Sequence, residues 1–345
     1  MNGDGGAPVI SPVPLMEIST GFWASKTLAV SLELGLFTLL SDGRGLTAAE
    51  LAEALRISER PAEMLLTGCA SLGLLQRRDG RYVNTPLADE CLVPGRPYYF
   101  GGWVQMLDQR LYRAWGELDR AVRTNSPTSR HPGAQAHLFD GIDPELLDVF
   151  WDAMHSLSAY SGRTLAHAVD LSGVRRLLDV GGGSGSVDIE LCRYHPDLRA
   201  TVFDLPEVCP IAETKARLAG VADRIGTAPG DFLADAALPA GHDAVLLSMV
   251  LHDWDETRVP EILRKCHDAL PPDGLIIISE LLVNDEKTGP APAALMSLNM
   301  LIETGGRNYT PAEYTAWLSA AGFSDPRVVW FDSPGANGAI TARRP

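Results

Sequence analysis

Leu177-Leu178-Asp179-Val180-Gly181-Gly182-Gly183-Ser184-Gly185 is the stretch that decides the fold of this chain. An apolar strand ends in a carboxylate, Asp179, and continues into a turn of four glycines and one serine. Glycine tolerates positive φ angles and close approaches that a Cβ forbids. A ligand can therefore lie against the backbone between the strand and the next helix, and we expect Asp179, Gly181 and Gly183 at that ligand.

A second carboxylate indicates what kind of ligand this is. The segment 200–204 has the composition of the next strand and ends in Asp204, 21 residues after Gly183. An acid at this spacing accepts hydrogen bonds from ribose hydroxyls. The dinucleotide fingerprint needs glycine or alanine at the sixth position counted from Gly181, where this chain has Ser186. We therefore expect a nucleoside-bearing ligand other than a dinucleotide.

The second half of the chain alternates strands with helices, which is typical of a largely parallel sheet covered on both faces. The final two strands are expected to form an antiparallel hairpin. The predicted strands span residues 176–180, 200–204, 224–228, 243–248, 274–280, 326–331 and 338–342.

A chain of 345 residues exceeds the usual size of one domain, so we expect two. We expect a disordered N-terminus, a compact helical domain, a helical linker that contributes to the acceptor pocket and a ligand-binding domain. Their ranges are 1–14, 15–110, 111–170 and 171–345. Within the linker, the pattern predicts one helix over 111–122 and another over 144–168.

The first domain has the outline of a winged helix. Thr47 and Glu50 predict a capping box at a helix start, residues 60–72 predict a further helix, and residues 74–83 predict a hairpin. A helix that reads DNA needs several basic or amide side chains, and the helix over 60–72 has only Arg60 as a basic residue. Its apolar surface is better explained by contact with another subunit, so we expect a homodimer.

The composition excludes several function classes. A net charge of −15 opposes nucleic-acid and anionic membrane partners, and no apolar run is long enough for a membrane span. The N-terminus has no basic start or apolar signal core, and the five cysteines lack paired or C-x-x-C spacing. We expect a cytoplasmic protein with reduced thiols and without a zinc site.

Two polar elements follow later strands. Asp231 and Phe232 come after the third strand, where an acid can accept from an exocyclic amine and a ring can cover a purine. His252 follows the fourth strand and is well placed as a general base, because its ordinary pKa is about 6.5. Glu280 ends the next strand at the same edge of the sheet. We expect Glu280, with Asp253, to orient and support His252.

Residues 15–345 resemble the family of S-adenosylmethionine-dependent small-molecule O-methyltransferases, which includes plant caffeate and flavonoid enzymes, hydroxyindole O-methyltransferase and bacterial natural-product enzymes. The resemblance rests on the glycine turn, Asp204-Leu205-Pro206, His252-Asp253-Trp254, Glu280 and residues 297–301. It implies a Rossmann-like doubly wound methyltransferase domain of the α/β class and a winged-helix dimerisation domain. It also implies Leu205 and Ser248 at the cofactor, S-adenosylmethionine.

The resemblance further implies residues of the acceptor site. Met154 and Met300 lie in segments that match the pocket of the family, and Asn299 matches a substrate-contacting asparagine of the hydroxyindole branch. Asn308 is also expected at the acceptor site; many relatives have a glutamate in its place, so one negative charge beside His252 is missing. That loss is expected to lower the basicity of His252.

The expected reaction is methyl transfer to a phenolic or enolic hydroxyl of an aromatic or polyketide-type small molecule, as in antibiotic biosynthesis. Alignment of the reactants supplies most of the catalysis, and His252 takes the hydroxyl proton. Two alternatives stay open at this point. One is methylation of an enol or ring carbon with the same fold and cofactor, and the other is a non-catalytic winged-helix regulator.

Overall fold

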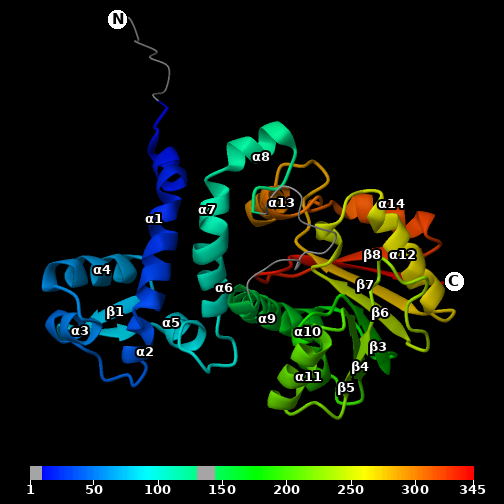
Figure 1. Ribbon diagram of the computed structural model, residues 1–345, viewed down its shortest axis with the longest axis horizontal. Helices are drawn as coiled ribbons and strands as arrows, with labels where there is room; N and C mark the ends of the chain where they lie inside the picture. The colour runs from blue at the N-terminus through cyan, green and yellow to red at the C-terminus, as the bar shows by residue number, and fades with distance from the viewer. Residues whose placement is uncertain (1–9, 130–143) are drawn as a thin grey trace, which may run out of the picture. The chain divides into compact units, whose positions relative to one another are not determined.

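The computed structural model describes residues 10–129 and 144–345, which form two compact units, one ending at Asp108 and the other beginning at Gln109 (Figure 1). This division falls close to the boundary after residue 110 expected from the sequence. α1 begins at Val13, within the segment 1–14 that we expected to be disordered, and residues 1–9 lie outside the described part.

The first unit packs helices against a two-stranded wing. Its elements are α1 (Val13–Glu33), α2 (Leu36–Leu39), α3 (Ala48–Leu55), α4 (Glu59–Ser71), β1 (Leu75–Arg78), β2 (Arg81–Asn84), α5 (Pro86–Cys91) and α6 (Gly101–Met106). The capping box at α3 is present as expected: Glu50 N donates to Thr47 Oγ1, and Thr47 N donates to the Glu50 carboxylate. A π-helical turn, η1 (Leu107–Leu111), follows α6.

The second unit is built on a seven-stranded sheet with the order β5-β4-β3-β6-β7-β9-β8. The first five strands in this order are parallel, and β9 is antiparallel to both β7 and β8. The strands are β3 (Arg176–Val180), β4 (Arg199–Asp204), β5 (Ile225–Pro229), β6 (Ala244–Ser248), β7 (Leu275–Glu280), β8 (Ser324–Trp330) and β9 (Gly338–Arg343). All seven strands lie within two residues of the predicted ones.

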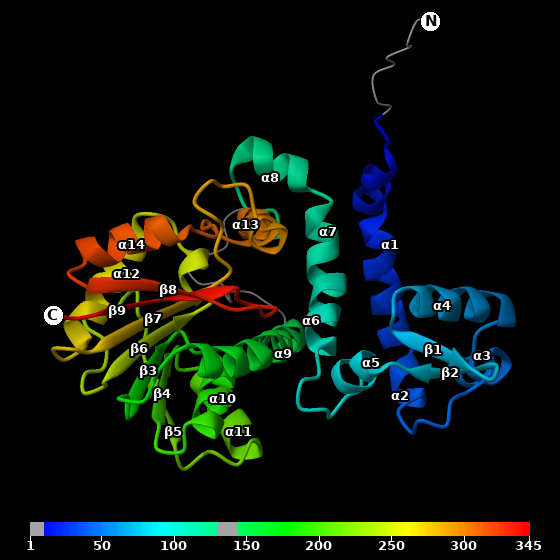
Figure 2. The same cartoon turned by 180° about the vertical axis from the view of Figure 1, so that it is seen from behind.

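Helices cover both faces of this sheet (Figures 1 and 2). Side chains alternate along each strand, so Leu246 faces one core and its neighbour Leu247 faces the other. The helices of this unit, not all of which pack on the sheet, are α7 (Tyr112–Trp115), α8 (Leu118–Thr124), α9 (Pro144–Ala168), α10 (Ser186–Tyr194), α11 (Cys209–Leu218), α12 (Arg258–Ala269), α13 (Ala291–Glu303) and α14 (Pro311–Ala320). α9, α10 and α11 pack on the face of Leu246, and α12 and α14 pack on the face of Leu247.

The prediction of one helix over 111–122 was wrong. α7 ends at Trp115, and α8 begins at Leu118 after a turn at Gly116 and Glu117. The apolar spacing continues through this turn, so periodicity alone could not show the interruption, although glycine is a poor helix former.

The strand order reverses between β3 and β6, because the chain moves outward through β4 and β5 and then returns to the other side of β3. Ligands of open α/β sheets bind outside the carboxyl ends of the strands at such a switch point. No helix in the described ranges, 10–129 and 144–345, is long and apolar enough to cross a membrane.

Candidate functional site

The glycine turn after β3 is shaped by close neighbours. Gly181 and Gly183 have φ angles of 71° and 56°, which favour glycine. A Cβ on Gly183 would lie 2.9 Å from the Trp151 ring, and one on Gly182 would lie 2.6 Å from Asp179 Oδ2. The turn therefore depends on glycine for both its conformation and its packing.

A cavity of about 180 Å³ opens beside this turn. Its walls come from α9, the glycine turn and the segments that follow β4, β5 and β6. The predicted site residues that line it are Met154, Asp179, Gly181, Gly183, Asp204, Leu205, Asp231, Phe232, Ser248 and Asp253. His252, Glu280, Asn299, Met300 and Asn308 do not line this cavity.

The Asp204 side chain is hydrogen-bonded to the backbone of the glycine turn. Its Oδ2 accepts a hydrogen bond from Gly183 N at 2.8 Å, and its Oδ1 accepts one from Leu205 N at 2.7 Å. Burial raises the pKa of this carboxyl group, and the two backbone amides oppose that shift. Each oxygen still has a lone pair, so the carboxylate can accept from a diol that lies in the cavity.

Asp179 has an acidic neighbour that the sequence analysis missed. Asp179 and Asp188 are both fully buried, and burial together with their mutual proximity raises the pKa of Asp179 well above its ordinary value. Burial also raises the pKa of Asp188 to about 7. Two adjacent buried carboxyl groups cannot both carry a charge at low cost, so the pair holds a proton near neutral pH.

Asp231 and Phe232 form another wall of the cavity. Asp231 Oδ1 accepts from Leu233 N at 2.8 Å, which fixes the turn after β5. The Phe232 ring meets the Trp254 ring edge to face, with centroids 5.9 Å apart. These two rings provide an apolar surface on which a flat heterocycle can lie.

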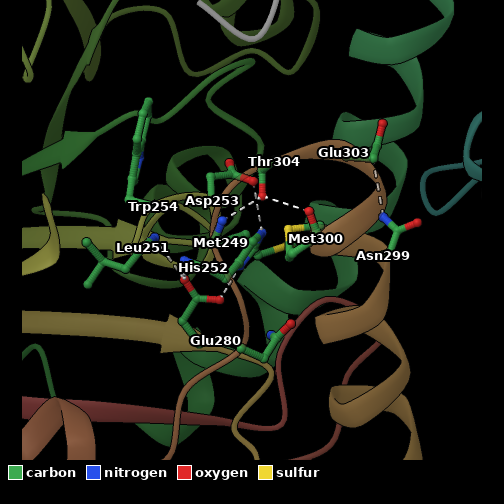
Figure 3. Close-up of polar contacts among 12 residues, drawn as sticks. Met249, Leu251, His252, Asp253, Trp254, Glu280, Asn299, Met300, Glu303 and Thr304 are labelled. Carbon is green, nitrogen blue, oxygen red and sulfur yellow. Dashed lines mark hydrogen bonds and ion pairs between the residues drawn. The ribbon is translucent and has the colours of Figure 1, made fainter. Parts of the chain in front are cut away.

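His252 and Glu280 form a buried pair at the carboxyl ends of β6 and β7 (Figure 3). His252 Nδ1 lies 2.5 Å from Glu280 Oε2, and Glu280 Oε1 accepts from the backbone N–H of Leu251 at 3.1 Å. The carboxylate thus fixes the Nδ1–H tautomer and leaves Nε2 as the free basic atom. Asp253 Oδ1 is 3.8 Å from Nε2.

The pKa of His252 rises from 6.5 to about 9. Burial disfavours the imidazolium, but the negative charges of Glu280 and Asp253 outweigh that effect. The expected loss of basicity from Asn308 therefore does not bring this pKa below its ordinary value. Asn308 itself donates from Nδ2 to Leu281 O at 2.8 Å.

Residues at the end of α13, and Thr304 directly after it, lie near His252. Figure 3 shows Met300 and Thr304 beside the imidazole, with Asn299 and Glu303 further along the same helix end. Asn299 accepts from Trp115 Nε1 at 2.9 Å and donates to Glu303 Oε2 at 3.3 Å. Asn299 is therefore engaged with other side chains near the site.

Several further residues line the cavity without having been predicted from the sequence. Trp151 and Ser158 flank Met154 on α9 at helical spacing, which is a signal that could have been used. Met249 has a φ of 56°, a strained conformation for this residue that often occurs at functional sites. Phe150 and Trp254 also line the cavity.

These features suit S-adenosylmethionine. Backbone at the glycine turn is open to close approach, Asp204 can hold ribose hydroxyls, and Phe232 can cover an adenine ring. Asp179 Oδ1 has no hydrogen-bond partner among the described residues, and a cationic ligand would satisfy it. Among the described residues, four acidic side chains and neither lysine nor arginine line the cavity, which favours a cationic cofactor.

Comparison with protein families gives two matches. Residues 115–324 match the O-methyltransferase domain, and residues 16–94 match the O-methyltransferase dimerisation domain.

Individual relatives match over nearly the whole chain. A 3-hydroxy-5-methyl-1-naphthoate 3-O-methyltransferase of Streptomyces sahachiroi is 53% identical over 95% of this chain and 94% of its own length. The tetracenomycin polyketide synthesis 8-O-methyltransferase TcmO of Streptomyces glaucescens is 35% identical over 94% and 95%. The crystal structure of human N-acetylserotonin methyltransferase in complex with S-adenosylmethionine superposes with a TM-score of 0.86 at 32% identity and covers 98% of this chain and 99% of that chain.

Replacing Asp204 by alanine should weaken S-adenosylmethionine binding about 10- to 100-fold, because charge-assisted hydrogen bonds contribute about 1.5–3 kcal/mol. Calorimetric titration measures the affinity, and circular dichroism checks the fold. Glu207→Ala is the matched control, since Glu207 is an exposed acid three residues away. Equal affinities of Asp204→Ala and wild type would contradict the assignment.

Replacing Glu280 by glutamine should lower the pKa of His252, because the larger of the two negative charges that raise it would be removed while burial would still lower it. The rising limb of kcat/KM against pH should move to lower pH, and its plateau should fall because the base is weaker. Asp253→Asn should shift the limb in the same direction by less, since the charge of Asp253 raises the pKa less than that of Glu280. A limb that stays in place in Glu280→Gln would rule out this electrostatic coupling.

Proposed function

This chain belongs to the O-methyltransferase family and uses S-adenosylmethionine, and from that premise we propose that it methylates a phenolic hydroxyl of an aromatic polyketide-type small molecule with His252 as general base. The observation that carries the proposal is the His252–Glu280 contact, which keeps a proton on Nδ1 and leaves Nε2 as the basic atom of the ring. The two Streptomyces relatives, named for a hydroxynaphthoate and a tetracenomycin intermediate, support an aromatic polyketide acceptor.

The raised pKa of His252 matches this acceptor. A phenol has a pKa of about 10, so proton transfer to a base of pKa about 9 is nearly balanced. Only about one part in a hundred of such a base is neutral at pH 7. Turnover should therefore increase with pH up to about 9. An unactivated alcohol is far too weak an acid for this base.

The remaining chemistry is alignment. S-adenosylmethionine, when bound, supplies an activated methyl group on a sulfonium. Asp204 and the glycine turn hold the ribose end, and His252 Nε2 fixes the acceptor hydroxyl from the opposite side and takes its proton. Met154 offers an adaptable apolar wall to the ring of the acceptor. Alignment of this kind can lower the activation free energy by about 7–11 kcal/mol.

Replacing His252 by alanine should reduce kcat by about 10²–10⁴, the usual effect of losing a general base. Cofactor affinity should change little, because His252 does not line the cavity beside the glycine turn. Mass spectrometry of product formed from a panel of phenols measures turnover and identifies the methylated atom. If the variant matches wild type at pH 7, His252 only positions the acceptor.

We further propose a cytoplasmic homodimer. All five cysteines are free thiols and four are buried, as expected in a reducing compartment. α1 carries a set of exposed apolar side chains that a monomer would leave in water. They are Val13, Leu15, Met16, Ile18, Phe22 and Trp23, each more than half exposed.

The double variant Ile18→Glu, Phe22→Glu should halve the molar mass measured by light scattering, because a buried carboxylate in an apolar interface is costly. Leu218→Glu, at an equally exposed leucine of the other unit, is the control and should leave the mass unchanged. A monomeric wild type would refute the dimer.

A further inference from the structure

Arg110 is a guanidinium held near the acceptor side of the site, and nothing above assigns it a role. It lies in the π-helical turn η1, a type of irregularity that often occurs at functional sites. Its side chain is only 18% exposed. Its guanidinium carbon lies 5.6 Å from the centre of the Phe150 ring, and Phe150 lines the cavity.

A chain of polar contacts fixes this guanidinium. Arg110 Nη2 lies 2.8 Å from Glu303 Oε1, and Glu303 Oε2 accepts from Asn299. Trp115 Nε1 in turn donates to Asn299 Oδ1. Glu303 is the single ion-pair partner of Arg110 in the part of the chain that the structure describes. A guanidinium has five N–H donors in one plane, so it can hold a second carboxylate.

The charge of the cavity makes this cation significant. Four aspartates line the cavity, and the whole chain has a net charge of −15, so an anionic acceptor would be repelled. The cavity itself is lined by neither arginine nor lysine among the described residues. Arg110 supplies a cation at its edge, against the face of an aromatic wall.

We propose that Arg110 binds the carboxylate of an aromatic hydroxy acid and thereby selects acidic acceptors over neutral phenols. Glu303 and Asn299 position the guanidinium, which lies over the Phe150 ring at the wall of the cavity. This inference rests on the proposed function, because it names the class of acceptor that the same site takes.

The test compares an acid with its neutral counterpart. For Arg110→Met, KM for 3-hydroxy-1-naphthoic acid should increase at least about tenfold, while kcat/KM for 2-naphthol should stay within about twofold of wild type. Arg110→Lys should recover part of the affinity for the acid. Arg120→Met is the control, because Arg120 forms an exposed ion pair with Glu117. Equal losses for acid and naphthol in Arg110→Met would overturn the proposal.

A binding measurement separates this inference from the proposed reaction. 1-Naphthoate has no hydroxyl group, so its calorimetric titration into enzyme loaded with S-adenosylhomocysteine reports carboxylate binding without methyl transfer. Arg110→Met should weaken this binding at least about tenfold. Equal binding to wild type and variant, or none to wild type, overturns the role of Arg110. Intact binding without any methylated phenol would instead contradict the proposed function.

Discussion

The buried carboxylate of Glu280 is the constraint on which the site depends. Glu280 is 1% exposed, and a charge in that position is stable only when its oxygens are paired. It meets this requirement by accepting from the backbone of Leu251 and His252 and from the His252 ring. The turn η2 (Leu251–Asp253) after β6 is therefore fixed to the end of β7, and the orientation of the His252 imidazole follows from it.

Packing on the opposite side completes this arrangement. A Cβ on Gly306 would collide with the backbone carbonyl of His252 and with Asp253 and Trp254. The loop after α13 can therefore approach η2 only because position 306 is glycine. Glu280 and this loop thus hold η2 from two sides, and Glu280 engages Nδ1 of the His252 ring rather than Nε2.

The parts of the site that could be predicted are those fixed by local chain geometry. A strand, a glycine turn and a helix follow one another within a few residues, and Asp204 ends the adjacent parallel strand, so spacing alone places them together. The same logic places His252 beside Glu280. Trp151, Asp188 and Arg110 lie on helical segments, and which of their faces meets the site depends on tertiary packing that periodicity does not encode.

The cofactor side and the acceptor side of the site have different charge environments. Acidic side chains beside the glycine turn stabilise a cationic donor, and the proton held by Asp179 and Asp188 limits how negative that region becomes. In the proposed reaction the acceptor carries a hydroxyl that His252 deprotonates, and any further negative charge on the acceptor needs a cation of its own. Glu303 holds Arg110 on the side where Phe150, rather than an aspartate, forms the wall. Because the two environments are separate, one acidic protein can bind a cationic cofactor and an anionic acceptor side by side. Each ligand meets a side chain of opposite charge at short range, and salt screens the field of the more distant charges.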